Sequence, residues 1–112
     1  MSVSKEQWLA EMTENFGVEP EDVLEVAAMF FEAIDGRLAG IAKAHHEGDM
    51  KELNRLAHGL KGDAANMSFP EVSKLARELE TQSKTGAVVD FEVQFRALSA
   101  AVGNKKDFLG LE

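Results

Sequence analysis

The sequence has no cysteine among its 112 residues. This absence excludes disulfide bonds, thiolate metal sites and cysteine nucleophiles together. It also favours an intracellular protein, and we expect a cytoplasmic location. No apolar run approaches the roughly 18 residues that a membrane-spanning helix needs, and no apolar segment follows a charged N-terminus. We therefore expect neither a membrane span nor a signal peptide.

Basic residues are few, and the charges are unevenly distributed. Residues 1–48 carry a net charge of −7, residues 49–85 a net charge of zero and residues 86–112 a net charge of −1. The acidic first part repels nucleic acid, and no basic tract is present to bind it. We therefore expect no nucleic-acid binding.

Strand signals are missing as well. The sequence shows neither a strand-length alternation of apolar and polar residues nor an Asn-Gly or Asp-Gly turn between β-branched segments. Apolar residues instead recur with the period of a helix. The length is sufficient for one domain with its own hydrophobic core. We predict a single all-α domain over residues 1–112.

Capping residues and prolines mark the starts of five helices. The marked positions are Ser4 with Gln7, Glu19 with Pro20, Asp49 with Glu52, Ser68 with Pro70 and Glu71, and Asp90. Glycines close the first, second and fourth helices at or near Gly17, Gly48 and Gly86. Gly103-Asn104 leaves open where the fifth helix ends.

The longer helices carry apolar faces. On the second helix the predicted face consists of Val23, Val26, Ala27, Phe30, Ile34, Leu38, Ile41 and His45. On the third helix it consists of Leu53, Leu56, Ala57, Leu60, Ala64 and Met67. Amphipathic helices joined by short turns pack antiparallel. We predict an up-down antiparallel four-helix bundle, with the short first helix capping one end.

The third helix also carries a histidine on the flank away from its apolar face. His58 is therefore expected to point toward water. The acids Glu52 and Asp63 are expected to project to the far side of the helix. The predicted result is a cationic patch with small residues around His58, made of Lys51, Asn54, Arg55, Lys61, Gly62 and Ala65.

Within this patch His58 has the properties of a nucleophile. A neutral, exposed imidazole has a free lone pair and needs no dedicated base. Gly62 lies one turn beyond His58, although a glycine inside a helix costs about 1 kcal/mol relative to alanine. The missing side chain leaves room for a bulky group or a partner's surface. Lys61 is within reach of a group on the ring, and its ammonium suits phosphoryl oxygens.

The stretch His58-Gly59-Leu60-Lys61-Gly62-Asp63-Ala64-Ala65 resembles the motif of histidine-containing phosphotransfer (HPt) domains, roughly His-x-Leu-Lys-Gly-x-Ala/Ser. Leu75-Ala76-Arg77-Glu78-Leu79-Glu80 resembles the helix that follows this motif, and the predicted bundle is the family's architecture. The resemblance implies that His58 accepts a phosphoryl group from a receiver-domain aspartyl phosphate and passes it to another receiver. It also implies partners, namely response-regulator receiver domains and a hybrid histidine kinase.

The resemblance assigns roles to residues near His58. Lys61 would stabilise the charge of the phosphoryl group, and Gly62 would allow close approach. Family members often have glutamine or glutamate on the next helix, near the other ring nitrogen. Glu80 resembles that residue and would hold the tautomer of the histidine.

Two positions depart from the family pattern. Many members have glycine where Ser68 stands, and often where Ala65 stands. We expect Ser68 to cap the next helix and so to replace the glycine in the turn. Ala65 narrows the space beside His58, which would affect which receivers fit.

The sequence lacks a Gly-rich nucleotide loop and a Walker-type lysine, so we expect neither ATP binding nor autokinase activity. It also lacks Glu-x-x-His pairs on facing helices, and we expect no metal site and no cofactor. In the HPt family, the metal and the catalysis belong to the receiver. We therefore expect a monomeric phosphocarrier rather than an enzyme.

Two groups of residues are candidates for contact with a partner. Arg55 and Ala65 lie on the flank that carries His58. Leu24, Ala28 and Phe31 lie on the second helix, off its predicted core face. These three form either an apolar patch beside His58, onto which a receiver helix docks, or a surface buried beneath the first helix.

Other functions remain open from the sequence. The main alternative is an adaptor or sequestering module that binds receiver or kinase domains without carrying phosphate. A third possibility is an enzyme that uses His58 and Lys61 as acid and base, although no third group is evident. Taken singly, Lys61 and Glu80 also fit the alternative interpretation that each is an ordinary solvated side chain. His45 is expected to pack near the end of its helix.

Overall fold

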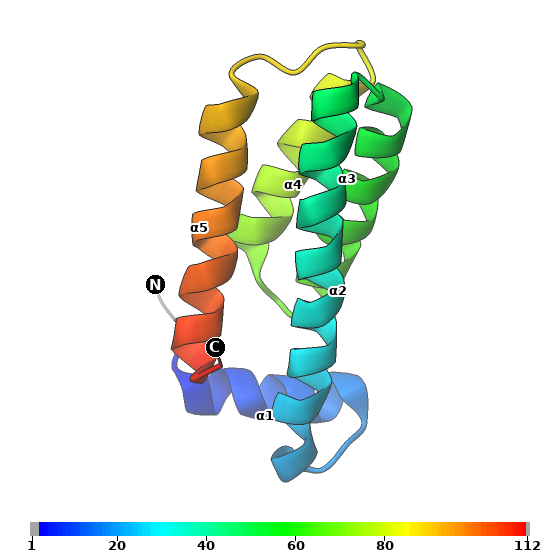
Figure 1. The fold of residues 1–112 in the computed structure, drawn as a ribbon. Coiled ribbons are helices and arrows are strands. Elements are labelled where there is room, and N and C mark those ends of the chain that lie inside the picture. The colour runs from blue at the N-terminus through cyan, green and yellow to red at the C-terminus, as the bar shows by residue number, and fades with distance from the viewer. Residues whose placement is uncertain (1–2, 112) are drawn as a thin grey trace.

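The computed structural model describes residues 3–111, which form five helices and no strand. The helices are α1 (Lys5–Phe16), α2 (Pro20–Glu47), α3 (Met50–Asn66), α4 (Pro70–Ser83) and α5 (Phe91–Leu109). Four of them lie along the long axis of the molecule, and α1 lies across one end (Figure 1). The prediction of an all-helical fold is confirmed.

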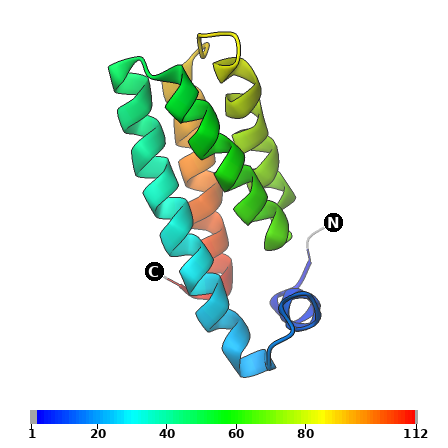
Figure 2. The ribbon, with the colours of Figure 1, turned by 90° about the vertical axis from the view of Figure 1, so that its right-hand side faces the viewer.

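Helix α3 is held between two neighbouring helices. Its most extensive packing is against α4, and its next most extensive is against α2. Figure 2 shows α3 flanked by these two helices, with α5 behind them. Because α5 lies behind, one side of α3 faces away from the bundle. A residue on that side is held on a rigid helix and remains open to a partner.

Most predicted helix boundaries are confirmed. Ser4 and Gln7 form a reciprocal capping box at the start of α1. The Asp49 side chain accepts a hydrogen bond from the Glu52 backbone N–H at the start of α3. Gly17 and Gly48 end α1 and α2 with φ angles of 67° and 71°, in the left-handed region that glycine adopts without strain. These ends follow from local chemistry, so the sequence predicted them well.

The role predicted for Ser68 is wrong. The residue before α4 that occupies the N-cap position is Phe69, and it makes no side-chain cap. Ser68 instead ends α3, with a φ of 57°. The Ser68 backbone N–H donates to the Ala65 carbonyl at 3.0 Å, and the Phe69 backbone N–H donates to the Ala64 carbonyl at 2.9 Å. This pair of bonds is the Schellman pattern, whose left-handed position is usually glycine.

Helix α5 continues through Gly103 and Asn104 to Leu109, and this settles the boundary that the sequence left open. Leu109 is buried, so its packing supports the last turn of the helix. Asp90 occupies the predicted N-cap position, but its side chain makes no capping hydrogen bond and its φ is 51°.

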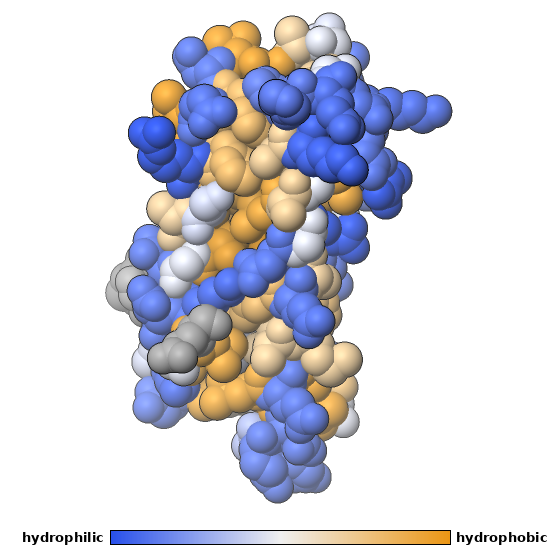
Figure 3. Space-filling model, viewed as in Figure 1, coloured by the Kyte–Doolittle hydropathy of each residue, from blue (hydrophilic) through white to orange (hydrophobic). Residues whose placement is uncertain are grey.

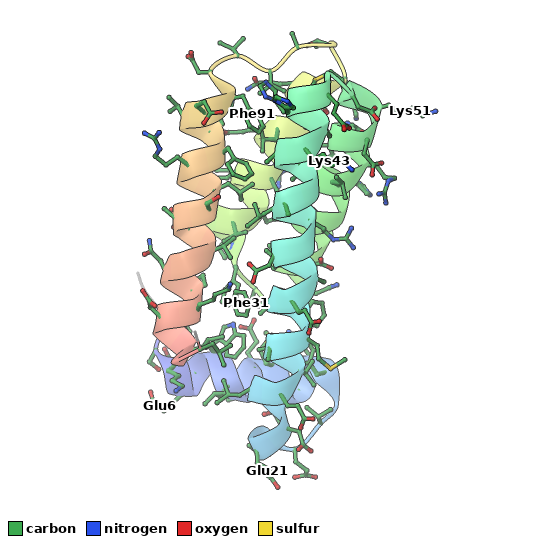
Figure 4. All side chains as sticks on the ribbon, in the orientation of Figure 1. Glu6, Glu21, Phe31, Lys43, Lys51 and Phe91 are labelled. Atoms are coloured by element: carbon green, nitrogen blue, oxygen red, sulfur yellow. The ribbon has the colours of Figure 1, made fainter. Side chains whose placement is uncertain are left out.

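The core face of α2 differs from the predicted one at adjacent phenylalanines. Phe31 is buried and lies 6.0 Å from the Phe69 ring, between α2 and α5 (Figure 4). Phe30 is only half-buried and stacks on Phe16 of α1 at 5.6 Å. Helix α2 contacts α3 on one side and α5 on another, so its buried face is wider than a single stripe. The single predicted stripe therefore contained the wrong phenylalanine.

The surface is mixed in character. Figure 3 shows apolar residues along the junction of α2 and α5, whereas hydrophilic residues cover the tip where α2 begins. Within residues 3–111, no helix combines the length and the apolar character that crossing a bilayer requires.

Candidate functional site

His58 lies on the outward side of α3. Its side chain is 67% exposed, as the sequence predicted. Leu56, Ala57 and Leu60, its neighbours along the helix, are buried and hold α3 against the rest of the bundle. The alternation of buried and exposed positions on one helix therefore fixes the ring at the surface on a rigid backbone.

The imidazole is held from α4 by a carboxylate. Glu80 Oε2 lies 2.5 Å from His58 Nδ1, and Glu80 Oε1 accepts a hydrogen bond from Lys61 Nζ at 2.7 Å. Glu80 is only 7% exposed, although it is a charged residue. The structure therefore brings together the histidine, the lysine and the glutamate that the sequence singled out.

The charge state of Glu80 follows from its partners. The hydrogen bond from Lys61 lowers the pKa of the Glu80 carboxyl, burial opposes this effect, and the hydrogen bond with His58 lowers the pKa further. Glu80 is therefore a carboxylate near neutral pH. A carboxylate only accepts hydrogen bonds, so Nδ1 of His58 is the donor. In the neutral ring this leaves the lone pair on Nε2, the nitrogen on the other edge.

A second layer of hydrogen bonds holds Glu80 in place. Asn54 Nδ2, on α3, donates to the Glu80 backbone carbonyl at 2.8 Å and to Ser83 Oγ at 3.1 Å. Ser83 Oγ in turn donates to the same carbonyl at 2.8 Å. The sequence placed Asn54 on the His58 flank but did not reveal this role, and it gave no indication of Ser83. The available sequence signal for Asn54 was its position as a polar residue one turn before His58, on a helix expected to pack against the next helix.

The two glycines of the motif serve different purposes. A Cβ atom at Gly59 would collide with the Arg37 side chain of α2, whose Nε donates to Asp63 Oδ2 at 2.9 Å. Gly59 therefore gives Arg37 its path across α3. A Cβ atom at Gly62 would meet nothing within 4 Å. The packing of this chain does not require a glycine at position 62.

An open groove of about 620 Å³ lies beside His58, between α3 and α4. The predicted patch without acids is wrong, because Glu52 lines this groove and pairs with Arg55 at 2.7 Å. Glu52 and Arg55 are three residues apart on α3, so the two side chains lie on the same side of the helix. The prediction that Glu52 projects to the far side of α3 was therefore wrong. Lys51 projects away from the end of α3 (Figure 4). The groove is lined by Asp49, Lys51, Glu52, Asn54, Arg55, His58, Glu80 and Lys84.

The three apolar candidates on α2 lie elsewhere. Ala28 and Phe31 line a different groove, together with Lys106 of α5 and Leu111. Phe31 is buried and Leu24 is half-buried, whereas Ala28 is exposed. None of the three lines the groove at His58. These residues therefore form no patch beside His58, and two of them, Ala28 and Phe31, lie next to α5 instead.

The other histidines and possible metal ligands form no comparable site. His45 is half-buried and stacks on Phe91 at 3.7 Å, so it is packed near the end of its helix as predicted. His46 is exposed. In the part of the chain that the structure describes, no three histidine, aspartate or glutamate side chains gather as a metal site.

Comparison with known protein families places residues 25–105 in the Hpt domain family. Neither a curated protein nor a solved structure matched the chain in the same comparisons. The matched segment contains α3 and α4 in full, and so includes the exposed histidine and the glutamate that holds it. The chain therefore belongs to the Hpt domains, the histidine phosphotransfer domains of two-component signalling.

Proposed function

We propose that His58 is the phosphoryl acceptor of a phosphorelay. In the forward step, the Nε2 lone pair forms a bond to the phosphorus of a receiver's aspartyl phosphate. The bond between phosphorus and the aspartate oxygen breaks, and its electron pair stays on the aspartate. The reverse step delivers the phosphoryl group to a second receiver. The observation that carries this proposal is the 2.5 Å contact between Glu80 Oε2 and His58 Nδ1, which leaves Nε2 free.

The surrounding residues have supporting roles in this proposal. Lys61 stabilises the negative charge of the phosphoryl group, and its ammonium is held 2.7 Å from Glu80, the carboxylate that contacts the His58 ring. Gly62 admits the receiver, because the space above it is open. Arg55 and Ala65 are both exposed and contact the receiver at the edges of the site.

The protein acts as a carrier and the receiver supplies the catalysis. The motif pattern supports this division, because no nucleotide-binding loop is present in the sequence. We further infer that the domain is a cytoplasmic monomer and that a hybrid histidine kinase stands in the same relay. We also infer an up-down antiparallel bundle of α2 to α5, since short turns join α2, α3 and α4.

The test is transfer from a receiver domain that carries ³²P on its aspartate. We expect acid-labile label on the wild-type protein and none on His58→Gln. His46→Gln is the matched control, because His46 is also exposed but lies on α2. Label that persists in His58→Gln would contradict the site. Stable binding to the receiver without any label would favour the adaptor function instead.

A further inference from the structure

We propose that Arg55 exchanges its bond to Glu52 for a bond to the phosphoryl group once that group is on His58. This inference rests on the proposed function of His58. It deepens that function, because it names a side chain that binds the phosphoryl oxygens directly. Lys61 acts on the same charge from its place beside Glu80, whereas Arg55 moves.

The open space beside His58 lies on the side of Arg55. In a helix, a long side chain leans toward the N-terminus and covers the turn before its own Cα atom. Arg55 lies in that preceding turn, three residues before His58, so the two side chains are neighbours on the helix surface. The groove beside His58 is lined by Arg55 and by neither Lys61 nor Gly62. A phosphoryl group in this groove therefore lies on the side of Arg55.

The bond that holds Arg55 is easily given up. Arg55 Nε donates to Glu52 Oε1 and Arg55 Nη2 donates to Glu52 Oε2, both at 2.7 Å. The Arg55 and Glu52 side chains are 64% and 41% exposed, so water solvates both of them after they separate. An exposed ion pair of this kind contributes little to stability. Arg55 is therefore a cation that can be recruited from its partner.

Lys61 is held more firmly than Arg55. Its ammonium bonds to Glu80, whose side chain is only 9% exposed. If Lys61 moved to the phosphoryl group, a buried carboxylate would lose its cation, and water could not easily replace that partner. The exchange at Arg55 therefore disturbs the site less than an exchange at Lys61.

A guanidinium also suits the new partner. Its planar N–H groups form paired hydrogen bonds with two phosphoryl oxygens as they do with a carboxylate. A phosphoryl group carries close to two negative charges near neutral pH, whereas Glu52 carries one, so the exchange is favourable. Of the other cations in the groove, Lys51 projects away from the end of α3 (Figure 4) and Lys84 follows the end of α4.

The equilibrium of phosphoryl transfer tests the exchange. The protein is mixed with a receiver domain that carries ³²P on its aspartate, and the label on both proteins is measured once its distribution is constant. The equilibrium constant depends on the free proteins and not on their complex. A contact between Arg55 and the receiver alone would therefore leave it unchanged.

We expect Arg55→Ala to lower this equilibrium constant about fivefold, the upper range for an exposed ion pair. The fold should be unaffected, because the Arg55 side chain is exposed. Lys84→Ala is the matched control, since it removes one positive charge from the same groove. It should change the equilibrium constant by less than about twofold.

Glu52→Gln tests the pair itself. Glutamine weakens the hold on Arg55, so the equilibrium constant should rise. It also removes a charge that repels the phosphoryl group, and the double variant with Arg55→Ala separates these two effects. We expect the rise to disappear in the Arg55→Ala background. A rise of equal size in both backgrounds would show that Glu52 acts by its own charge, and the exchange would be wrong.

Two further outcomes are decisive. An unchanged equilibrium constant in Arg55→Ala, approached more slowly than in the wild type, would overturn the exchange and assign Arg55 to the receiver contact alone. A failure of His58 to take label from the receiver and also from potassium phosphoramidate, a small phosphoryl donor, would overturn the proposed function instead.

Discussion

At the scale of the residue, Glu80 connects the parts of the site. It lies on α4, whereas His58 and Lys61 lie on α3, and each of its carboxylate oxygens contacts one of them. A buried carboxylate with two partners is a stable arrangement, since both oxygens are satisfied. Removal of either partner therefore lowers the free energy of unfolding, although the His58 side chain itself lies at the surface.

Replacement of Lys61 by alanine is expected to destabilise the fold. The substitution leaves Glu80 buried without its cation, and a buried acceptor that loses its partner costs about 1–3 kcal/mol. Urea unfolding at neutral pH measures the loss. Lys84→Ala is the matched control, because Lys84 lines the same groove but is exposed, and it should cost no more than about 0.5 kcal/mol. Equal losses in the two variants would contradict the role given to Lys61.

Replacement of Gly62 by alanine should separate stability from function. Alanine favours the helix by about 1 kcal/mol, and the added methyl group meets nothing within 4 Å, so the free energy of unfolding should rise. Labelling from a phosphorylated receiver should slow, because the receiver must approach closely. Labelling by small phosphoramidate should remain unchanged.

Gly59→Ala provides the contrast to that variant. Its methyl group would displace Arg37 from its path to Asp63, so the gain in helix propensity is offset and the stability should rise less than in Gly62→Ala. Receiver labelling should change little in Gly59→Ala. If both alanine variants slow receiver labelling equally, close approach at Gly62 is not the cause.

At the scale of the element, the short connection between α3 and α4 sets how the two halves of the site meet. Three residues, 67–69, separate the helices. The left-handed conformation of Ser68 and the buried Phe69 reverse the chain within that distance. The Trp8 Nε1–H donates to the Met67 carbonyl at 2.7 Å and ties α1 to the same turn. The turn therefore places α4 so that Glu80 reaches His58.

Ser68→Gly is expected to stabilise the protein. A non-glycine residue in the left-handed region costs roughly 1–2 kcal/mol, and glycine loses about 0.5–1 kcal/mol more conformational entropy on folding. The midpoints of these two ranges give a net expected gain of about 0.75 kcal/mol, which urea unfolding measures. Ser4→Gly is the matched control, since Ser4 has a φ of −72° and its side chain caps α1. That variant should lose a few tenths of a kcal/mol, and a loss in Ser68→Gly would contradict the strain argument.

At the scale of the whole molecule, Glu80 makes stability depend on pH. Its pKa in the folded protein is lowered from the ordinary value near 4.5, chiefly by the hydrogen bond from Lys61. The unfolded chain therefore binds the proton more readily. The contribution of Glu80 is fully present above the ordinary pKa and is lost as the pH falls through the folded one.

Urea unfolding of the wild type and of Glu80→Gln, between pH 7 and pH 3, measures this dependence. The stability advantage of the wild type should be constant near neutral pH and should shrink in the acidic range. Glu78→Gln, which changes an exposed carboxylate, should follow the wild type throughout. An advantage that does not change with pH would show that Glu80 contributes by packing rather than by charge.

Sequence reasoning predicted the helices well where the responsible interactions are local. The Ser4 and Asp49 caps, and the terminal glycines Gly17 and Gly48, each act within a few residues of the chain. The exposure of His58 was predictable for the same reason, because the helical period alone places His58 on the opposite side of the helix from Leu56 and Leu60. The motif around His58 then indicated the family.

Tertiary structure decided the features that depend on contact between helices. The burial of Phe31 depends on the position of α5, and the contact that a side chain at position 59 would make depends on Arg37 of α2. The contact between Glu80 and His58 depends on the turn at Ser68. The sequence by itself determined a helical chain with an exposed histidine, because capping and periodicity are local. Only the packing of α4 on α3 decided which ring nitrogen is held and which remains free.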